Sequence, residues 1–265
     1  MPTVTAHAVG TFNWPELATS DPVAAKKFYG SLFGWQIEDQ DMGPNGTYTI
    51  FKHKGLDVAA CYQLMPDMVK LGVPPNWAAY VTVENADASA EKSKALGGQV
   101  VMGPFDVKDY GRMAVISDPQ GATFCVWEPR KHIGVLILNE PGSLAWTQLN
   151  AKDPESAKKF YPALLGWKVQ DDAMPAAMGG GSYTTWLKAD GPAGGMMGMP
   201  KEAPAPSHWL SYFAVANVDE SAAKAASLGG LTYVPPTDIP GMGRFAVLAD
   251  PQGAAFALVA FLPRG

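Results

Sequence analysis

The stretch FNWPELATSDPVAAKKFYGSLFGW, from Phe12 to Trp35, returns as LAWTQLNAKDPESAKKFYPALLGW, from Leu144 to Trp167. Twelve of the 24 aligned positions are identical, and the same offset of 132 residues relates Trp77 to Trp209. A register kept over that length indicates two homologous domains rather than an array of short repeats. A residue that both copies keep is expected to serve the shared architecture, whereas one that differs can serve separate tasks.

The length and composition suit two domains of ordinary size, which we expect at 8–130 and 143–262 with a linker at 131–142. A hydrophobic content of 47% is enough for each half to build a core of its own. The net charge is −5 and the lysines and arginines are scattered. We therefore expect neither nucleic acid nor an anionic membrane surface as a partner.

The two cysteines, Cys61 and Cys125, stand in apolar runs and form no metal-ligand or redox spacing. We expect reduced thiols in the core of a cytoplasmic protein. The N-terminal MPTVTAHAVG has no apolar segment of a signal peptide, and the longest aliphatic run, 133–138, is too short to span a bilayer. No targeting or membrane segment is therefore expected.

A helix is predicted after Asp21-Pro22 and again after Asp153-Pro154, because each pair offers a capping carboxylate and then proline at the first helical position. Gly34 supplies the C-terminal stop of the first copy. The apolar positions that follow the helical repeat are Ala25, Phe28, Tyr29, Leu32 and Phe33, matched by Ala157, Phe160, Tyr161, Leu164 and Leu165.

Extended segments surround each helix, so the unit is a strand, a helix and three strands. In the first copy we expect strands near 11–17, 35–39, 47–53 and 57–64, then 77–84, a helix at 87–96, and strands near 99–102, 111–117 and 122–128. Each domain is thus an α+β pair of βαβββ modules. Whether the modules pair within a domain or across the two stays open from the sequence.

Alternation within the strands assigns their faces. In WAAYVTVE, Trp77, Ala79 and Val81 should lie under the helices, leaving Ala78 and Tyr80 on the other face. In GATFCVWE, Phe124 and Val126 point one way and Cys125 and Trp127 the other. A curved sheet with helices outside and a partly polar inner face forms a cup.

The D-P-x-x-A-x-x-F-Y-x-x-L-x-G-W signature and the D-P-x-G turns at 118–121 and 250–253 resemble the vicinal oxygen chelate superfamily. This group includes glyoxalase I, bleomycin resistance proteins, fosfomycin resistance enzymes and extradiol dioxygenases. The resemblance covers nearly the whole chain, and in particular the chain looks like tandem-domain actinobacterial proteins labelled glyoxalase-like or hydroxylase. It implies the fold, but not one activity, because this scaffold hosts isomerases, transferases, oxygenases and binding proteins.

The resemblance also implies positions for the ligands of a divalent metal. The first-strand position falls on Trp14 and Trp146, the fifth-strand position on Ala78 and Leu210, and the last-strand position on Cys125 and Ala257. None of these is a hard oxygen or nitrogen ligand, whereas a catalytic metal needs about three. Two residues beyond the first position, Glu16 and Gln148 are the plausible substitutes, and His208 could join Gln148. We expect no cofactor, with a divalent metal on Glu16, Gln148 and His208 as the alternative.

Aromatic residues supply the other candidates. Trp14 and Trp146 would form apolar stacking surfaces on the inner faces, and Trp127 is a further candidate for binding. Tyr80 and Tyr212 end in a hydroxyl that could bond a substrate oxygen, with Tyr80 also a candidate proton carrier. Core packing is the alternative for the tryptophans, and a hydrogen bond to a neighbour for the tyrosines.

Glu16 is the sharpest catalytic candidate, since a carboxylate beside tryptophan-bearing strands would have a raised pKa and act as a general base. Gln148 stands at the matching position and can bind a ligand but cannot act as a base. If Glu16 is catalytic, the two cups are not equivalent. The alternative is a solvent-exposed strand end, which Pro15 favours.

Other conspicuous residues have ordinary interpretations. Arg112 and Arg244 are expected to form structural ion pairs at the seam between the domains. His7, His53 and His132 are expected on the surface. The Met-rich segment 194–199 is typical of an adaptable strand that lines a hydrophobic pocket.

Three hypotheses follow. The first is a metal-independent, monomeric or homodimeric protein that binds a small apolar or aromatic molecule, either to sequester it or to transform it by acid–base chemistry. The second is a metal-dependent enzyme of glyoxalase, lyase or dioxygenase type. The third is a non-catalytic structural or interaction protein whose cups are filled.

Overall fold

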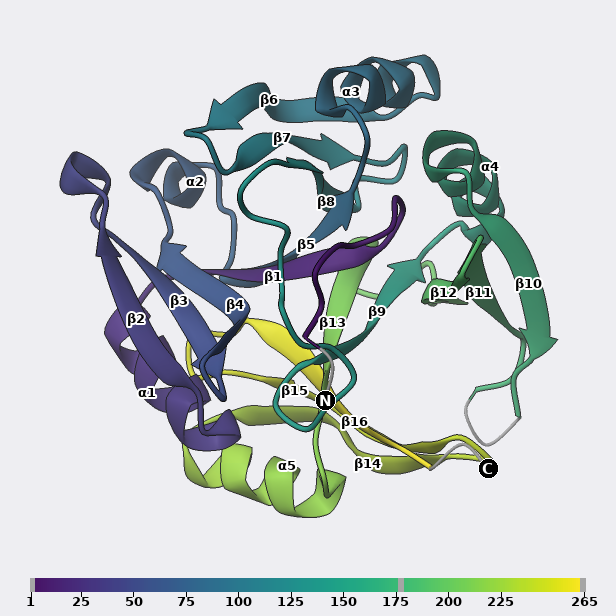
Figure 1. The fold of residues 1–265 in the computed structure, drawn as a ribbon. Coiled ribbons are helices and arrows are strands. Elements are labelled where there is room, and N and C mark those ends of the chain that lie inside the picture. The colour runs from purple at the N-terminus through teal and green to yellow at the C-terminus, as the bar shows by residue number, and fades with distance from the viewer. Residues whose placement is uncertain (1–2, 176–178, 263–265) are drawn as a thin grey trace.

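The computed structural model describes residues 3–175 and 179–262 and contains two copies of one α+β domain (Figure 1). The elements of the first copy are β1 (Phe12–Thr19), α1 (Pro22–Phe33), β2 (Gln36–Asp41), a 3₁₀ turn (Gly43–Asn45), β3 (Thr47–His53), β4 (Leu56–Gln63), α2 (Pro66–Lys70), β5 (Asn76–Thr82), α3 (Ala86–Ala95), β6 (Gln99–Val107), β7 (Gly111–Ser117) and β8 (Thr123–Pro129).

Within the described residues, the second copy repeats this order of strands and longer helices, without a counterpart of the short helix α2. Its elements are β9 (Leu144–Ala151), α4 (Pro154–Leu165), β10 (Lys168–Ala173), β11 (Ser182–Lys188), β12 (Gly191–Gly198), β13 (His208–Ala214), α5 (Val218–Ser227), β14 (Leu231–Ile239), β15 (Gly243–Ala249) and β16 (Ala255–Phe261). The sequence did not predict α2, and β6 is longer than the strand expected at 99–102.

The predicted signals start and stop the first helix of each copy. Asp21 accepts a hydrogen bond from the backbone N–H of Ala24 at 3.0 Å, and Asp153 accepts one from Ser156 at 3.1 Å. Gly34 and Gly166 close α1 and α4 in the left-handed conformation, with φ of 71° and 73°.

The modules pair within each domain, which answers the question that the sequence left open. The first sheet has the strand order β2-β3-β4-β1-β5-β8-β7-β6, and the second has β10-β11-β12-β9-β13-β16-β15-β14. The central strands β1 and β5 are antiparallel, so Trp14 lies opposite Tyr80 and Glu16 opposite Ala78. The interpretation of Glu16 as an exposed strand end is wrong, because β1 is a central strand that continues past it to Thr19.

The predicted faces are confirmed. Trp77, Ala79 and Val81 belong to the clusters on the helix side of the sheet, as do Phe124 and Val126. Tyr80, Cys125 and Trp127 belong to a separate cluster on the concave side. A strand that is buried on both faces therefore separates packing residues from residues available to a site.

The expectation of one core per domain is wrong, because each core is shared between the two domains. Phe28 of α1 packs in one cluster with Ala222 of α5 and Phe256 of β16. Ala90 of α3 packs in the other with Phe160 of α4. Figure 1 shows the consequence, with α1 beside α5 at one side of the molecule and α3 beside α4 at the other.

Hydrogen bonds between the signature motifs of the two domains stabilise these shared cores. The Tyr29 hydroxyl donates to Asp250 at 3.0 Å and accepts from the Trp77 indole at 2.9 Å. Tyr161 likewise donates to Asp118 at 3.1 Å and accepts from Trp209 at 3.0 Å. The F-Y pair of one domain thus meets the D-P-x-G turn of the other, which explains why both copies keep both motifs.

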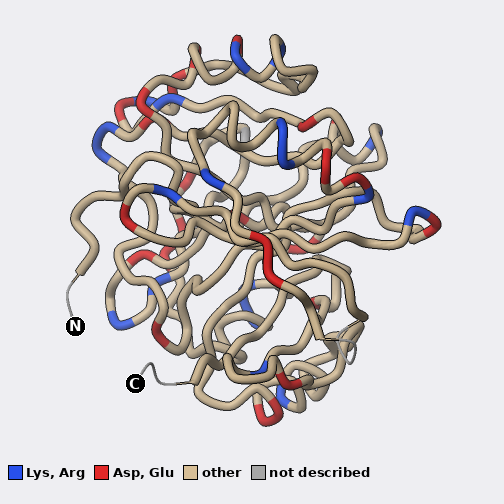
Figure 2. Tube along the Cα trace, turned by 90° about the vertical axis from the view of Figure 1, so that its right-hand side faces the viewer, with Lys and Arg blue, Asp and Glu red and all other residues tan. Residues whose placement is uncertain are grey.

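Most charged residues, unlike the buried Asp118 and Asp250, lie outside these cores. Figure 2 shows acidic and basic residues interspersed over the fold rather than gathered on one side. Arg112 forms ion pairs with Asp87 and Asp106, and Arg244 repeats them with Asp219 and Asp238. These pairs are structural, as predicted, but they lie within one domain and not at the seam. Within the described residues, no helix is long and apolar enough to cross a membrane.

Candidate functional site

The concave face of the first sheet, here the N-terminal cup, centres on a carboxylate held by two tyrosines. The hydroxyl of Tyr48 donates to Glu16 Oε1 at 2.6 Å, and that of Tyr80 donates to Oε2 at 2.7 Å. The Trp14 indole N–H donates in turn to the Tyr48 oxygen at 3.3 Å. The structure thus brings the two predicted catalytic residues, Glu16 and Tyr80, into direct contact.

Burial sets the acid–base properties of this group. Loss of solvation raises the pKa of Glu16, and the hydrogen bonds from Tyr48 and Tyr80 partly oppose that rise. Desolvation, with the Glu16 carboxylate nearby, holds the pKa of both tyrosines well above its usual range. The tyrosines therefore act as hydrogen-bond donors, and Glu16 is the group that can exchange a proton.

The interdomain linker fills the other end of the N-terminal cup. Val135 packs in the same buried cluster as Trp14 and Trp127, and its N–H donates to the Asn13 carbonyl at 2.7 Å. The His132 ring stands edge-on to Trp14 with centroids 4.6 Å apart, and its carbonyl accepts from the Trp127 indole at 2.8 Å. The prediction of a surface His132 is therefore wrong.

Two features of β1 admit the linker. The strand bulges between Phe12 and Trp14 and pairs with β4 only from Glu16 onward, as β9 pairs with β12 only from Gln148 onward. Leu136 bonds the Asp57 carbonyl of β4 at 2.9 Å in the space left. His7 bonds the Val135 carbonyl at 2.8 Å, so the N-terminal segment lies over the linker in turn. His7 and His53, like His132, are half-buried rather than exposed.

The concave face of the second sheet, here the C-terminal cup, carries a hydrogen-bonded row in place of the carboxylate. The Trp146 indole donates to Tyr183 at 2.8 Å, and the Tyr183 hydroxyl donates to Gln148 at 3.1 Å. The Gln148 amide nitrogen donates to Asn150 at 2.9 Å, and the Asn150 amide lies 3.1 Å from His208 Nε2. Gln148 and His208 are thus joined through Asn150.

Gly195 makes room for this arrangement. It lies opposite Gln148 on β12, and a Cβ built there would overlap the hydroxyl and ring of Tyr183. The matching residue of the N-terminal cup is Ala60, opposite Glu16. The Tyr183 ring therefore lies against a glycine of its sheet, whereas the matching Tyr48 has an alanine at the corresponding position.

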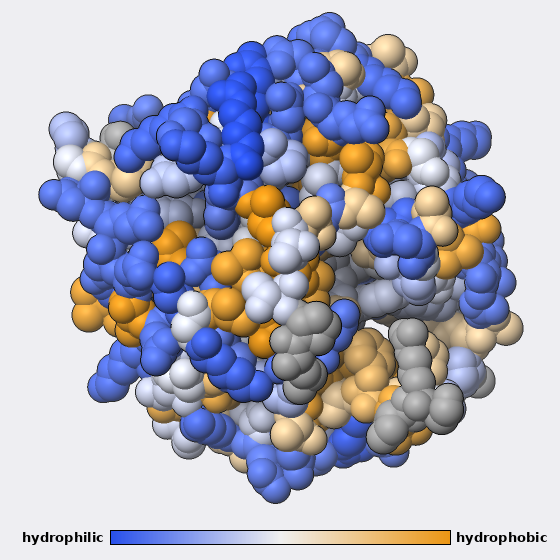
Figure 3. All heavy atoms as spheres, viewed as in Figure 1, coloured by the Kyte–Doolittle hydropathy of each residue, from blue (hydrophilic) through white to orange (hydrophobic). Residues whose placement is uncertain are grey.

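The two cups differ in what covers them. Trp14 is 4% exposed beneath the linker, whereas Trp146 is only half-buried. The apolar cluster of the C-terminal cup consists of residues from its own strands, among them Tyr212, Phe245 and Val259. Val259 stands where the first copy has Trp127, so this cup also has one indole fewer. Figure 3 shows a hollow right of centre, on the side of the C-terminal cup. In the same view, Figure 1 shows β9 and β11 above this place and β14 and β16 below it.

Tyr212 is nine-tenths buried in the floor of the C-terminal cup, beside Phe245 at a centroid distance of 6.4 Å. Among the described residues its hydroxyl has no hydrogen-bond partner, in contrast to Tyr80, which bonds Glu16. Burial raises its pKa, so the hydroxyl stays protonated and is available as a donor.

The predicted site residues therefore fall into two groups. Glu16, Tyr80, Trp14 and Trp127 lie in the N-terminal cup, and Trp146, Gln148, His208 and Tyr212 lie in the C-terminal cup. Sequence reasoning missed Tyr48, Tyr183 and Asn150. The signal for the tyrosines was present, since T-Y-T at 47–49 and S-Y-T at 182–184 open matching strands with tyrosine on the concave face.

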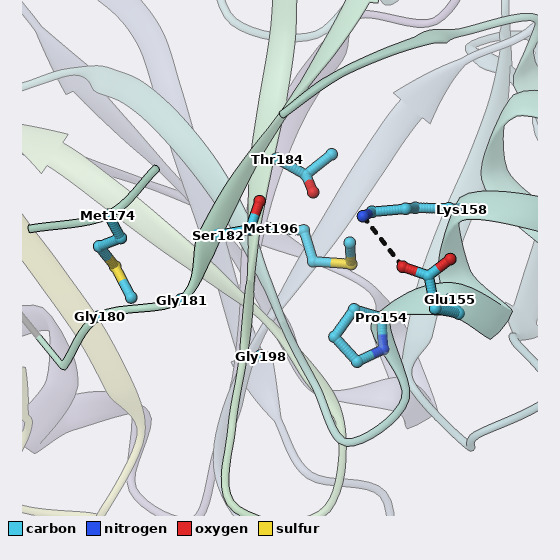
Figure 4. Close-up of a pocket in the computed structure, with 10 residues that line it drawn as sticks. All are labelled: Pro154, Glu155, Lys158, Met174, Gly180, Gly181, Ser182, Thr184, Met196 and Gly198. Atoms are coloured by element: carbon cyan, nitrogen blue, oxygen red, sulfur yellow. Dashed lines mark hydrogen bonds and ion pairs between the residues drawn. The ribbon is translucent and has the colours of Figure 1, made fainter. Parts of the chain in front are cut away.

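A cavity of about 290 Å³ lies on the other face of the second sheet, at the start of α4 (Figure 4). Lys158 and Glu155 form an ion pair on one side of it, and Thr184 and Met196 lie across from them. Of the Met-rich segment, Met196 and Gly198 line it, whereas Met197 lies on the concave face opposite Asn150. None of the predicted site residues lines this cavity.

Comparison with known proteins agrees with the duplicated fold. The family model of the Glyoxalase/Bleomycin resistance protein/Dioxygenase superfamily matches residues 11–126 and again 143–258. The chain belongs to this superfamily. Over the full length of both chains it is 42% identical to a protein of Mycobacterium tuberculosis named "Putative glyoxylase CFP32". It is 34% identical to the anthracycline biosynthesis protein DnrV of Streptomyces peucetius, over 97% of this chain and 95% of that one.

Among solved structures, the Mn(II)-bound glyoxalase of Novosphingobium aromaticivorans superposes with a TM-score of 0.64 at 16% identity, covering 95% of this chain and 82% of the other. At that identity the likeness extends to the fold alone. It raises the question of whether the concave residues of this chain suit a metal.

The donor set fits a metal poorly. Among the described residues, no three His, Cys, Asp or Glu side chains come together to hold an ion. Both oxygens of Glu16 already accept tyrosine hydrogen bonds, and His208 Nε2 meets the Asn150 amide. Glu16 lies in a different cup from Gln148 and His208, so these three residues do not form one site.

Proposed function

We propose that this superfamily member binds a small, largely apolar aromatic molecule in its C-terminal cup without a metal. The observation that carries the proposal is the half-buried indole of Trp146 beside the Tyr212 hydroxyl, which has no hydrogen-bond partner in the described part of the chain. Aromatic surfaces with a few polar groups are typical of small-molecule sites. The name of the relative DnrV supports this class of ligand, because anthracyclines are planar aromatic compounds.

Binding is tested by isothermal titration calorimetry with an uncharged planar aromatic probe such as 9-fluorenone. Trp146→Leu should weaken binding at least tenfold, because it removes the stacking surface. Trp14→Leu is the matched control, since this indole lies beneath the linker, and it should leave the affinity within about twofold. Absence of binding to the unmodified protein, or equal losses in both variants, would refute the proposal.

The metal-free part of the proposal is tested separately. Elemental analysis of protein purified without chelator or affinity metal should find no stoichiometric Zn, Mn, Ni or Fe. Titration with these ions should not raise the melting temperature in a way that depends on Glu16, Gln148 or His208. Near-stoichiometric metal that is lost on substituting these residues would favour a metal-dependent enzyme of glyoxalase or dioxygenase type.

A second function, proton transfer in the N-terminal cup, is favoured by the Glu16 geometry. Glu16, Tyr62 and Ala78 are half-buried at the end that the linker leaves free. In this mechanism Glu16 takes a proton from the bound molecule, while Tyr48 and Tyr80 hold the carboxylate and stabilise its charge. Exchange of the methyl protons of acetophenone in D₂O should be accelerated by the protein and lost in Glu16→Gln. Exchange that Glu16→Gln leaves unchanged would exclude this role.

A further inference from the structure

The hydrogen-bonded row of the C-terminal cup has a defined direction. The carbonyl oxygen of Pro206 can only accept, so His208 Nδ1, 2.8 Å away, carries a proton. In the neutral ring Nε2 is then an acceptor, and the Asn150 amide donates to it. Asn150 is therefore oriented with its oxygen toward Gln148.

This direction fixes the orientation of Gln148. Its nitrogen donates to the Asn150 oxygen, and its own oxygen accepts from Tyr183. One N–H of the amide then remains without a partner among the described residues. Gln148 is 6% exposed, so the concave face is the environment left to that N–H.

Tyr212 adds a second donor close by. Strand register puts Tyr212 opposite Trp146 and Leu210 opposite Gln148, so Tyr212 and Gln148 are diagonal neighbours on one face. Such pairs stand roughly 7–8 Å apart, within reach of one ligand. Both groups are nine-tenths buried and both can donate to the same molecule lying on Trp146.

The floor of this cup carries no formal charge. On the described strands β9, β13 and β16, the positions that face it hold no Asp, Glu, Lys or Arg. The edge strand β10 adds one exposed charge of each sign, Asp172 opposite Tyr183 and Lys168 opposite Leu187. Arg244 points to the other face, where it pairs with Asp219 and Asp238. A buried ionised ligand would thus lack a counter-charge on the floor.

We infer that the ligand of the C-terminal cup is an uncharged planar aromatic molecule with a hydrogen-bond-accepting oxygen, such as a ketone or a quinone. Its ring system lies on Trp146, and its oxygen accepts from Tyr212 and from the free N–H of Gln148. This inference rests on the proposed function, whose binding site it shares, and adds the chemical class that the site selects.

Three related probes test it by calorimetry: 9-fluorenone, fluorene, which lacks the oxygen, and 9-fluorenone-2-carboxylate, which adds a charge. Fluorenone should bind about two- to tenfold more tightly than fluorene, the range of one net hydrogen bond. The carboxylate should bind at least tenfold more weakly than fluorenone. Tyr212→Phe should reduce the preference for fluorenone over fluorene, because it removes one of the two donors, and should leave the affinity for fluorene unchanged. Tyr233→Phe, at an exposed position on β14, is the control and should change nothing.

The outcomes separate this inference from the proposed function. Equal, Trp146-dependent binding of fluorene and fluorenone would overturn the inference and leave aromatic binding intact. Binding of the carboxylate as tight as that of fluorenone would do the same. Failure of all three probes to bind the unmodified protein would overturn both.

Discussion

The two cups are built on the same backbone but have opposite interiors. In the N-terminal cup the linker covers Trp14 and Trp127, and a carboxylate clamped by two tyrosines remains at the free end. In the C-terminal cup Trp146 is half-buried, and a neutral row of amides replaces the carboxylate. The two copies thus share the scaffold, while a few substitutions and one connecting segment give each concave face a different lining.

The largest expected effect distinguishes the two tryptophans by their role in stability. Trp14→Ala should reduce the free energy of unfolding by about 3–5 kcal/mol, because it empties a buried cluster beneath the linker. Trp146→Ala should cost about 1–2 kcal/mol, because its indole is already partly in solvent. Urea unfolding of both variants measures the difference, and equal losses would show that the cups are equally packed.

The shared architecture predicts equal effects at a second pair of sites. Tyr29→Phe and Tyr161→Phe should each cost about 1–3 kcal/mol, since each leaves one oxygen of a buried carboxylate and an indole N–H without a partner. Both transitions should stay cooperative across the whole chain, because each core contains residues of both domains. Differential scanning calorimetry tests this. Two separate transitions, one for each half, would contradict the account of shared cores.

The linker provides a smaller test of the closed cup. His132→Ala should cost about 1 kcal/mol through the lost edge-on contact with Trp14. It should also increase acrylamide quenching of tryptophan fluorescence, measured in a Trp146→Phe background that removes the indole of the C-terminal cup. Unchanged quenching would show that the linker does not shield that cup.

The smallest effect concerns pH. The folded-state pKa of Glu16 is raised above its ordinary value of 4.5, so the protonated form is favoured by folding. Its contribution to stability is present below that value and is lost as the pH rises through the folded-state pKa. The stability of the unmodified protein relative to Glu16→Gln should therefore fall from acidic to neutral pH. A relative stability that rises over this interval would mean that the tyrosine bonds outweigh desolvation.

The longer helices and the strand faces could be predicted because local rules control them. Asp-Pro pairs start α1 and α4, and alternation placed Tyr80 and Cys125 on the concave face as observed. The sharing of each core between the two domains could not be predicted, because Tyr29 and Asp250 are 221 residues apart and nothing local links them. The same holds for His132, which packs against Trp14 of a strand far away along the chain. Tyr48 could have been placed on the concave face from its strand, but its contact with Glu16 appears only in the folded chain.

The most direct test of the central claim is the stoichiometry of aromatic binding. Calorimetric titration of the unmodified protein with 9-fluorenone should give one site per chain, and that site should vanish in Trp146→Leu and persist in Trp14→Leu. Two sites per chain, or one site that survives the loss of Trp146, would contradict the assignment of the C-terminal cup as the open one.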